Sequence, residues 1–140
     1  MFDKKVNGCP EVIQIVDIIE QGVTCPARCR LSDGIDAIVK YPKNAGGTEV
    51  LINELVGNSI ADVVGLTIPR YGICELTADI IDNIEFSEFI DCRNAGLSYF
   101  SEVISNSTPI NRIGLNRATN KETERLILFD HLIKNEDRHA

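Results

Sequence analysis

Three charged residues of this 140-residue sequence have surroundings in which they could take part in chemistry: Lys40, Glu54 and Asp137. Lys40 follows the short apolar run Ala37–Val39, and a lysine at the end of a strand can reach nucleotide phosphates as a point charge. The simpler interpretation is a solvated lysine that closes a strand. Asp137 follows a long amphipathic segment, so its carboxylate would lie in a loop held by a packed helix, where catalytic groups are commonly displayed.

Glu54 lies fourteen residues after Lys40, within a segment that has the period of a helix. A carboxylate there could hold the lysine in place. Glu49 is the alternative partner, but it stands nearer the start of the helix, where the helix dipole favours any acid. We therefore prefer Glu54 as the residue that would orient Lys40.

The turn before the second predicted strand reads Gln21-Gly22-Val23-Thr24-Cys25-Pro26. It contains one glycine, whereas a G-x-G-x-x-G loop that covers phosphates has three. A plain hairpin turn is the simpler interpretation. If the turn did cover phosphates, Gly22 would lie over them, and Thr24 could offer them its hydroxyl or be phosphorylated itself.

The elements that must position these residues follow from hydrophobic periodicity, which predicts an α+β fold. Strands are predicted over residues 11–20, 27–31, 36–41, 71–76 and 97–104, the first three as an antiparallel meander. A short helix and a loop are predicted over residues 77–95.

Two longer helices are predicted, and each has signals at its ends. The first lies between Thr48 as N-cap and Gly65 as stop. Its apolar stripe is formed by Leu51, Leu55, Val56, Ile60, Val63 and Val64. The second begins at the capping box Thr119–Glu122 and continues to about residue 134. Its stripe is formed by Leu126, Ile127, Phe129, Leu132 and Ile133.

Composition narrows the classes of protein. The chain is 44% hydrophobic and 25% charged, as expected for one globular domain, and its net charge of −7 argues against general binding to nucleic acid or anionic membranes. The apolar run Val12–Ile19 is interrupted by Gln14 and Asp17, so we expect neither a signal peptide nor a membrane span. We therefore expect a cytoplasmic location.

The sequence has five cysteines, an odd number that favours reduced thiols over a disulfide framework. Cys25 and Cys29 have a spacing that could form half of a zinc site. No second Cys or His pair completes a tetrahedron, so ordinary buried or loop thiols are the simpler interpretation.

Taken together, these segments resemble the HipA-like kinases, which are bacterial toxin-type Ser/Thr kinases and their relatives. The resemblance covers roughly residues 11–140. The matching segments are Gln21–Pro26, Asp33-Gly34 with Ala37–Lys40, Asn53–Gly57 running into Gly65–Pro69, Phe100–Ile104, and Asn135–His139.

The resemblance implies a protein-kinase-like small lobe with a five-stranded antiparallel sheet and one main helix. Residues 1–105 would form this lobe and the hinge, and residues 106–140 would begin the large lobe. ATP would be bound with Lys40 on the α- and β-phosphates and the main chain near Glu102 and Val103 on adenine. Glu54 would orient Lys40, and Asp137 would align the hydroxyl of the substrate.

The resemblance also implies Mg²⁺, but the family's metal-binding Asn and Asp would lie beyond Ala140. We therefore expect a truncated or split kinase that is inactive or impaired by itself, since phosphoryl transfer depends strongly on metal charge. Its expected partners are a protein substrate and either an antitoxin, as in toxin–antitoxin systems, or a complementing C-terminal half. The alternatives are a non-catalytic module that binds a nucleotide or a partner, and a phosphotransferase similar to the phosphoinositide kinases.

Overall fold

The computed structural model describes residues 4–20, 23–83, 88–104 and 120–133, with side chains in the last helix at 121 and 124–129. The strands are β1 (Val12–Ile18), β2 (Ala27–Leu31), β3 (Asp36–Lys40), β4 (Tyr71–Leu76) and β5 (Gly96–Glu102). The helices are α1 (Glu49–Val63), α2 (Ala78–Asp82), the 3-10 turn η1 (Cys92–Asn94) and α4 (Asn120–Ile133). The elements agree in type and order with those predicted from the sequence. The bounds of β2 and β4 agree to the residue.

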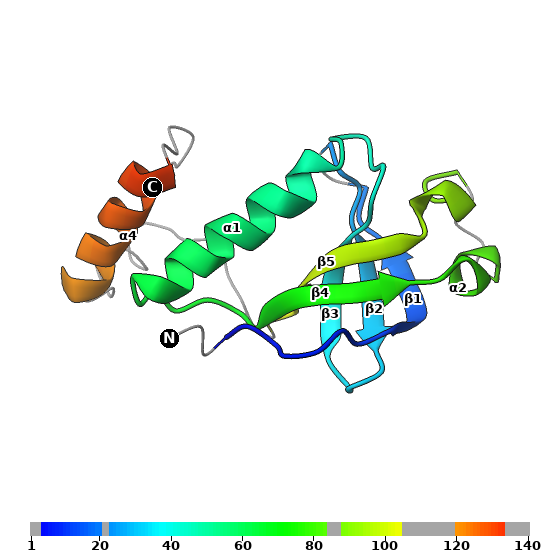
Figure 1. Ribbon diagram of the computed structural model, residues 1–140, viewed down its shortest axis with the longest axis horizontal. Helices are drawn as coiled ribbons and strands as arrows, with labels where there is room; N and C mark the ends of the chain where they lie inside the picture. Colours follow the sequence, from blue (N-terminus) through cyan, green and yellow to red (C-terminus); the bar gives the residue numbers. More distant parts are fainter. Residues whose placement is uncertain (1–3, 21–22, 84–87, 105–119, 134–140) are drawn as a thin grey trace.

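The strands form one antiparallel sheet in the order β1-β2-β3-β5-β4 (Figure 1). The first three strands are the predicted meander. Helix α1 then carries the chain to β4 at the far side of the sheet, and β5 returns between β4 and β3. The α+β fold expected for a kinase-like small lobe is therefore confirmed.

Strand register divides the side chains of the sheet between two faces. Lys40 is paired with Tyr99, while Ile38 is paired with Ser101 on one side and with Arg28 on the other. Directly paired residues point to the same side of a sheet, so these five share one face. Helix α1 packs against β4 and β5. We call the face that carries Lys40 and Tyr99 the α1 face.

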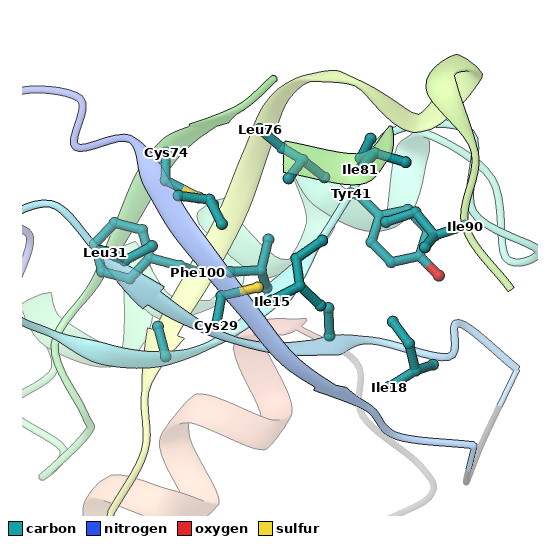
Figure 2. Packing of buried hydrophobic residues seen from close by; sticks show 14 of the residues in the cluster. Ile15, Ile18, Cys29, Leu31, Tyr41, Cys74, Leu76, Ile81, Ile90 and Phe100 are labelled. Carbon is teal, nitrogen blue, oxygen red and sulfur yellow. The ribbon is translucent and has the colours of Figure 1, made fainter. Parts of the chain in front are cut away.

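The opposite face, the core face, carries the hydrophobic core (Figure 2). Strand residues of the core include Cys29, Leu31, Ala37, Val39, Cys74, Leu76 and Phe100, all with 1% exposure or less. Tyr41, Ile81 and Ile90 close the core from the segments that follow β3 and β4. Burial raises the pKa of the Cys29 thiol to about 12, and it raises that of Cys74 as well. These two cysteines are thus apolar core residues.

Strand β1 is irregular. Its register with β2 shifts between Val12 and Gln14 and again between Ile15 and Asp17, as in a strand with two bulges. Buried residues therefore recur every third position in β1, at Val12, Ile15 and Ile18. The strand was predicted from the sequence, whereas the bulges were not.

Helix α1 ends in a Schellman motif at the predicted stop. Gly65 has φ +80° and donates to the carbonyl of Asp62 at 3.1 Å, while Leu66 donates to that of Ala61 at 2.9 Å. Arg125 of α4 donates to the Gly65 carbonyl at 2.9 Å. At the other end, Thr48 occupies the N-cap position, but its hydroxyl makes no capping hydrogen bond because its backbone is already helical.

The predicted apolar stripe of α1 is only partly buried. Val56 and Val63 are 51% and 52% exposed, and the one buried residue in the helix is Ala61. The stripe is wider than the surface that β4 and β5 offer to α1. In α4, Leu126 and Phe129 are partly buried, whereas Ile127 is 65% exposed.

An N-terminal arm runs beside β4. Lys5 and Glu11 form parallel bridges with Tyr71 and Glu75, and the Lys4 backbone N–H donates to Asp62 of α1 at 3.3 Å. The arm thus links β4 to the C-terminal part of α1, and Figure 1 shows it running below β4.

No helix among residues 4–20, 23–83, 88–104 and 120–133 is long and apolar enough to cross a membrane. The capping residue Thr119 lies outside the described residues.

The end of α1 gives a direct test of this geometry. Gly65→Ala should lower the free energy of unfolding by about 1–3 kcal/mol, since its φ is unfavourable for a residue with a Cβ. That Cβ would also lie 3.0 Å from the Arg125 guanidinium carbon. Gly57→Ala is the matched control in the same helix. No atom lies within 4 Å of its added Cβ, so it should stabilise by about 0.5–1 kcal/mol. Urea unfolding measures the free energy of unfolding of both variants. A change in the same direction for the two variants would contradict the assigned helix end.

Candidate active site

Lys40 and Glu54 form an ion pair between β3 and α1, in which the lysine ammonium donates to Oε1 of the carboxylate. The two side chains are 22% and 35% exposed, so the pair is accessible to a ligand. The partner of Lys40 is therefore Glu54. Glu49 lies in the first turn of α1 and is exposed.

The linker between β3 and α1 determines where the helix begins. Asn44 is buried; its amide donates to the Tyr41 carbonyl at 2.8 Å, and its Oδ1 accepts from the Gly46 N–H at 2.8 Å. Asn94 of η1 donates to the carbonyls of Pro42 and Lys43 at 2.9 and 3.1 Å. Neither asparagine was predicted from the sequence. For Asn44 the signal was its position inside a Gly- and Asn-rich linker.

The turn between β1 and β2 is tied to the same linker. The Tyr41 hydroxyl donates to the Cys25 carbonyl at 2.8 Å, and burial raises the pKa of this phenol to about 12. Thr24 packs on the linker, since a Cβ added at Gly46 would lie 3.0 Å from the Thr24 methyl carbon. The turn is thereby held at the Lys40 end of the sheet.

Thr24 lines a cavity of about 430 Å³ together with Tyr41, Asn44 and residues of the 88–94 segment. Neither Lys40 nor Glu54 is among its lining residues. The structure therefore places Thr24 against the linker, outside the immediate surroundings of the ion pair. Gly22 lies outside the described residues.

Beyond the ion pair, the β1–β2 part of the α1 face is open. Ile13 and Val16 are 51% and 45% exposed, and each belongs to a bulged pair of residues that opposes an arginine of β2 on this face. Ile38 of β3 is partly buried beside them. These residues were not predicted to form a surface, although the sequence of β1 indicates one. Its repeated apolar-apolar-polar order, VIQIVDI, supplies more apolar residues than one buried face requires.

Charged groups accompany this open surface. Arg28 donates to Asp36 at 2.7 Å, and this hydrogen bond lowers the pKa of the Asp36 carboxyl. Arg30 lies opposite Asp36 in the next strand and lowers that pKa further. On this part of the α1 face Arg28 and Lys40 are therefore held in ion pairs with Asp36 and Glu54, and Arg30 lies beside Asp36.

The predicted hinge residues lie at the other end of β5. The Glu102 N–H donates to the Arg70 carbonyl at 2.7 Å, and the Val103 N–H donates to the Asp36 carbonyl at 2.8 Å. The Glu102 carboxylate is also held by Arg70, at 2.7 and 2.8 Å, which lowers its pKa. Because both N–H groups are engaged within the sheet, an adenine ring at this position would have to use carbonyl oxygens.

Metal ligands do not gather in the described ranges. No three His, Cys, Asp or Glu side chains there come together in a way that could hold a metal ion. We therefore assign magnesium no step in this part of the chain. Asp137 lies outside the described residues.

Comparison with known proteins assigns the chain to a family. A model of the HipA-like kinase family matches residues 12–140, which is most of the chain and includes all five strands and both long helices. No curated protein and no solved structure matches the sequence. The extent of the family match, over a sheet that brings a strand lysine to a helix glutamate, shows that the chain belongs to the HipA-like kinases.

Proposed function

We propose that this chain binds ATP on the open part of the α1 face and serves in the transfer of its γ-phosphate to a Ser or Thr hydroxyl of a protein substrate. The observation that carries the proposal is the ion pair of Lys40 with Glu54. It holds a cation at the edge of an accessible apolar surface, next to the turn between β1 and β2.

The phosphate end of the site would be at Lys40. An ammonium is a strong donor to phosphate oxygens, and Glu54 holds it at the end of β3 so that it need not be ordered when ATP binds. The β1–β2 turn lies at the same end of the sheet, since Ala27 is paired with Val39. Thr24 is the hydroxyl residue of that turn and would lie toward the phosphate end of the nucleotide.

The adenine end would lie over Ile13, Val16 and Ile38. Small-molecule sites combine an apolar surface for the ring with a few polar groups that fix orientation. β5 runs antiparallel to β3, so Glu102 lies at the opposite end of the strand pair from Lys40. A nucleotide lying along β3 would thus have its base near Glu102 and Val103 and its phosphates near Lys40.

Asp137 is the proposed group that aligns the substrate hydroxyl and accepts its proton. This role comes from the family and from its position after α4 in the sequence. A complementing C-terminal segment or an antitoxin would be the proposed protein partner. Transfer should fall by roughly 10²-fold or more in Asp137→Asn, as expected when a positioned proton acceptor is lost.

The first test is ATP binding measured by calorimetry with magnesium present. Lys40→Met should weaken binding by roughly 10- to 100-fold, the range for loss of a hydrogen bond to a charged group. Glu54→Gln should weaken it less, because the lysine remains. Lys43→Met is the matched control: Lys43 is exposed in the linker, and its loss should leave the affinity unchanged. Absence of ATP binding by the parent chain would favour a module that binds another partner.

The second test concerns the apolar surface. Ile13→Thr and Val16→Thr should each reduce ATP affinity by about three- to tenfold, since each removes apolar area from the base. Stability should change little, because both side chains are about half exposed and threonine suits a strand. Leu97→Thr is the control, an exposed apolar residue of β5 at 63% exposure outside the proposed base site. A loss of affinity in the control as large as in the two β1 variants would refute the placement of the base.

A further inference from the structure

Two contacts between α1 and the sheet lie next to each other. One is the ion pair of Lys40 with Glu54, and the other is a hydrogen bond in which the Asn58 amide donates to the Tyr99 hydroxyl. Lys40 and Tyr99 are direct partners across β3 and β5. Glu54 and Asn58 are four residues apart in α1.

These two spacings match. Residues four apart on a helix have Cβ atoms about 5–6 Å from each other, and directly paired residues on neighbouring strands have Cβ atoms about 4.5–5.5 Å apart. One pair from the helix therefore faces one pair from the sheet across two parallel contacts. A rotation or a shift of α1 that broke one contact would displace the other.

Tyr99 is well placed to fix this arrangement. Its side chain is 4% exposed and lines a cavity of about 200 Å³ with Leu51 and Leu55 of α1. Burial raises the pKa of its phenol, and the nearby Glu54 carboxylate raises it further. The hydroxyl therefore stays protonated, a fixed acceptor for Asn58 beside the charged pair.

We propose that Tyr99 is a positioning residue that holds α1 in the rotation at which Glu54 reaches Lys40. Only the expected effect of Tyr99 on ATP affinity rests on the proposed function. The positioning itself can be measured without a nucleotide.

The experiment measures how fast an amine-reactive acylating reagent modifies Lys40, read by peptide mass spectrometry on the whole chain, with Lys43 as the internal reference. Glu54→Gln removes the ion pair and leaves the Lys40 side chain unrestrained, so it sets the upper limit of the rate. Tyr99→Phe keeps the ring and removes the acceptor oxygen. It should raise Lys40 labelling by about two- to tenfold, the range for loss of one hydrogen bond. Asn58→Ala should give the same increase, and the double variant should add nothing further.

Tyr71→Phe is the matched control. Tyr71 is also a buried tyrosine of the sheet whose hydroxyl donates to α1, to the Ser59 Oγ at 3.4 Å, but it is not paired with Lys40. It should leave Lys40 labelling at the parent rate. Unchanged labelling in both Tyr99→Phe and Asn58→Ala, or an equal increase in Tyr71→Phe, would overturn the proposal. Failure of the parent chain to bind ATP would count against the proposed function and leave the labelling result standing.

Discussion

The placement of α1 on the sheet is the constraint on which the candidate site depends. Lys40 belongs to the sheet and Glu54 belongs to the helix, so the ion pair exists only while these two elements keep one relative position. A partly exposed ion pair contributes little to stability, because water and salt screen it and two long side chains must be ordered. The pair is therefore held together by the rest of the structure and does not itself hold α1 in place.

That support comes from several separate contacts. The Schellman motif and Arg125 fix the end of α1, and the bonds of Asn44 and Asn94 fix the linker that leads into it. The core face of the sheet carries the hydrophobic core, whereas on the α1 face the described residues cover the sheet where α1 meets β4 and β5. This division lets one face provide rigidity while part of the other remains available to a ligand.

Much of this arrangement could be predicted from local patterns. Short apolar-rich runs between turn residues located β2 and β4, and a glycine located the end of α1. The position of Glu54 in the helix after the strand lysine, as in the kinases that the sequence resembles, indicated its pairing with Lys40. The bulges of β1 were missed because an apolar-rich segment looks like a buried strand whichever face its residues take. The engagement of the Glu102 and Val103 N–H groups could not be predicted, since it depends on carbonyls of Arg70 and Asp36 that are distant in sequence. The Tyr99–Asn58 bond was missed for the same reason.

The N-terminal arm has a consequence for how the boundary of this fold should be drawn. The family match begins at Val12, yet the residues just before it pair with the edge of β4. An unpaired strand edge offers backbone groups to any other chain and so promotes intermolecular β-pairing. A protein shortened to begin at Val12 would retain everything by which the family is recognised and lose the cover of that edge. The residue at which the family match begins is therefore not the residue at which a fold with a covered sheet edge begins.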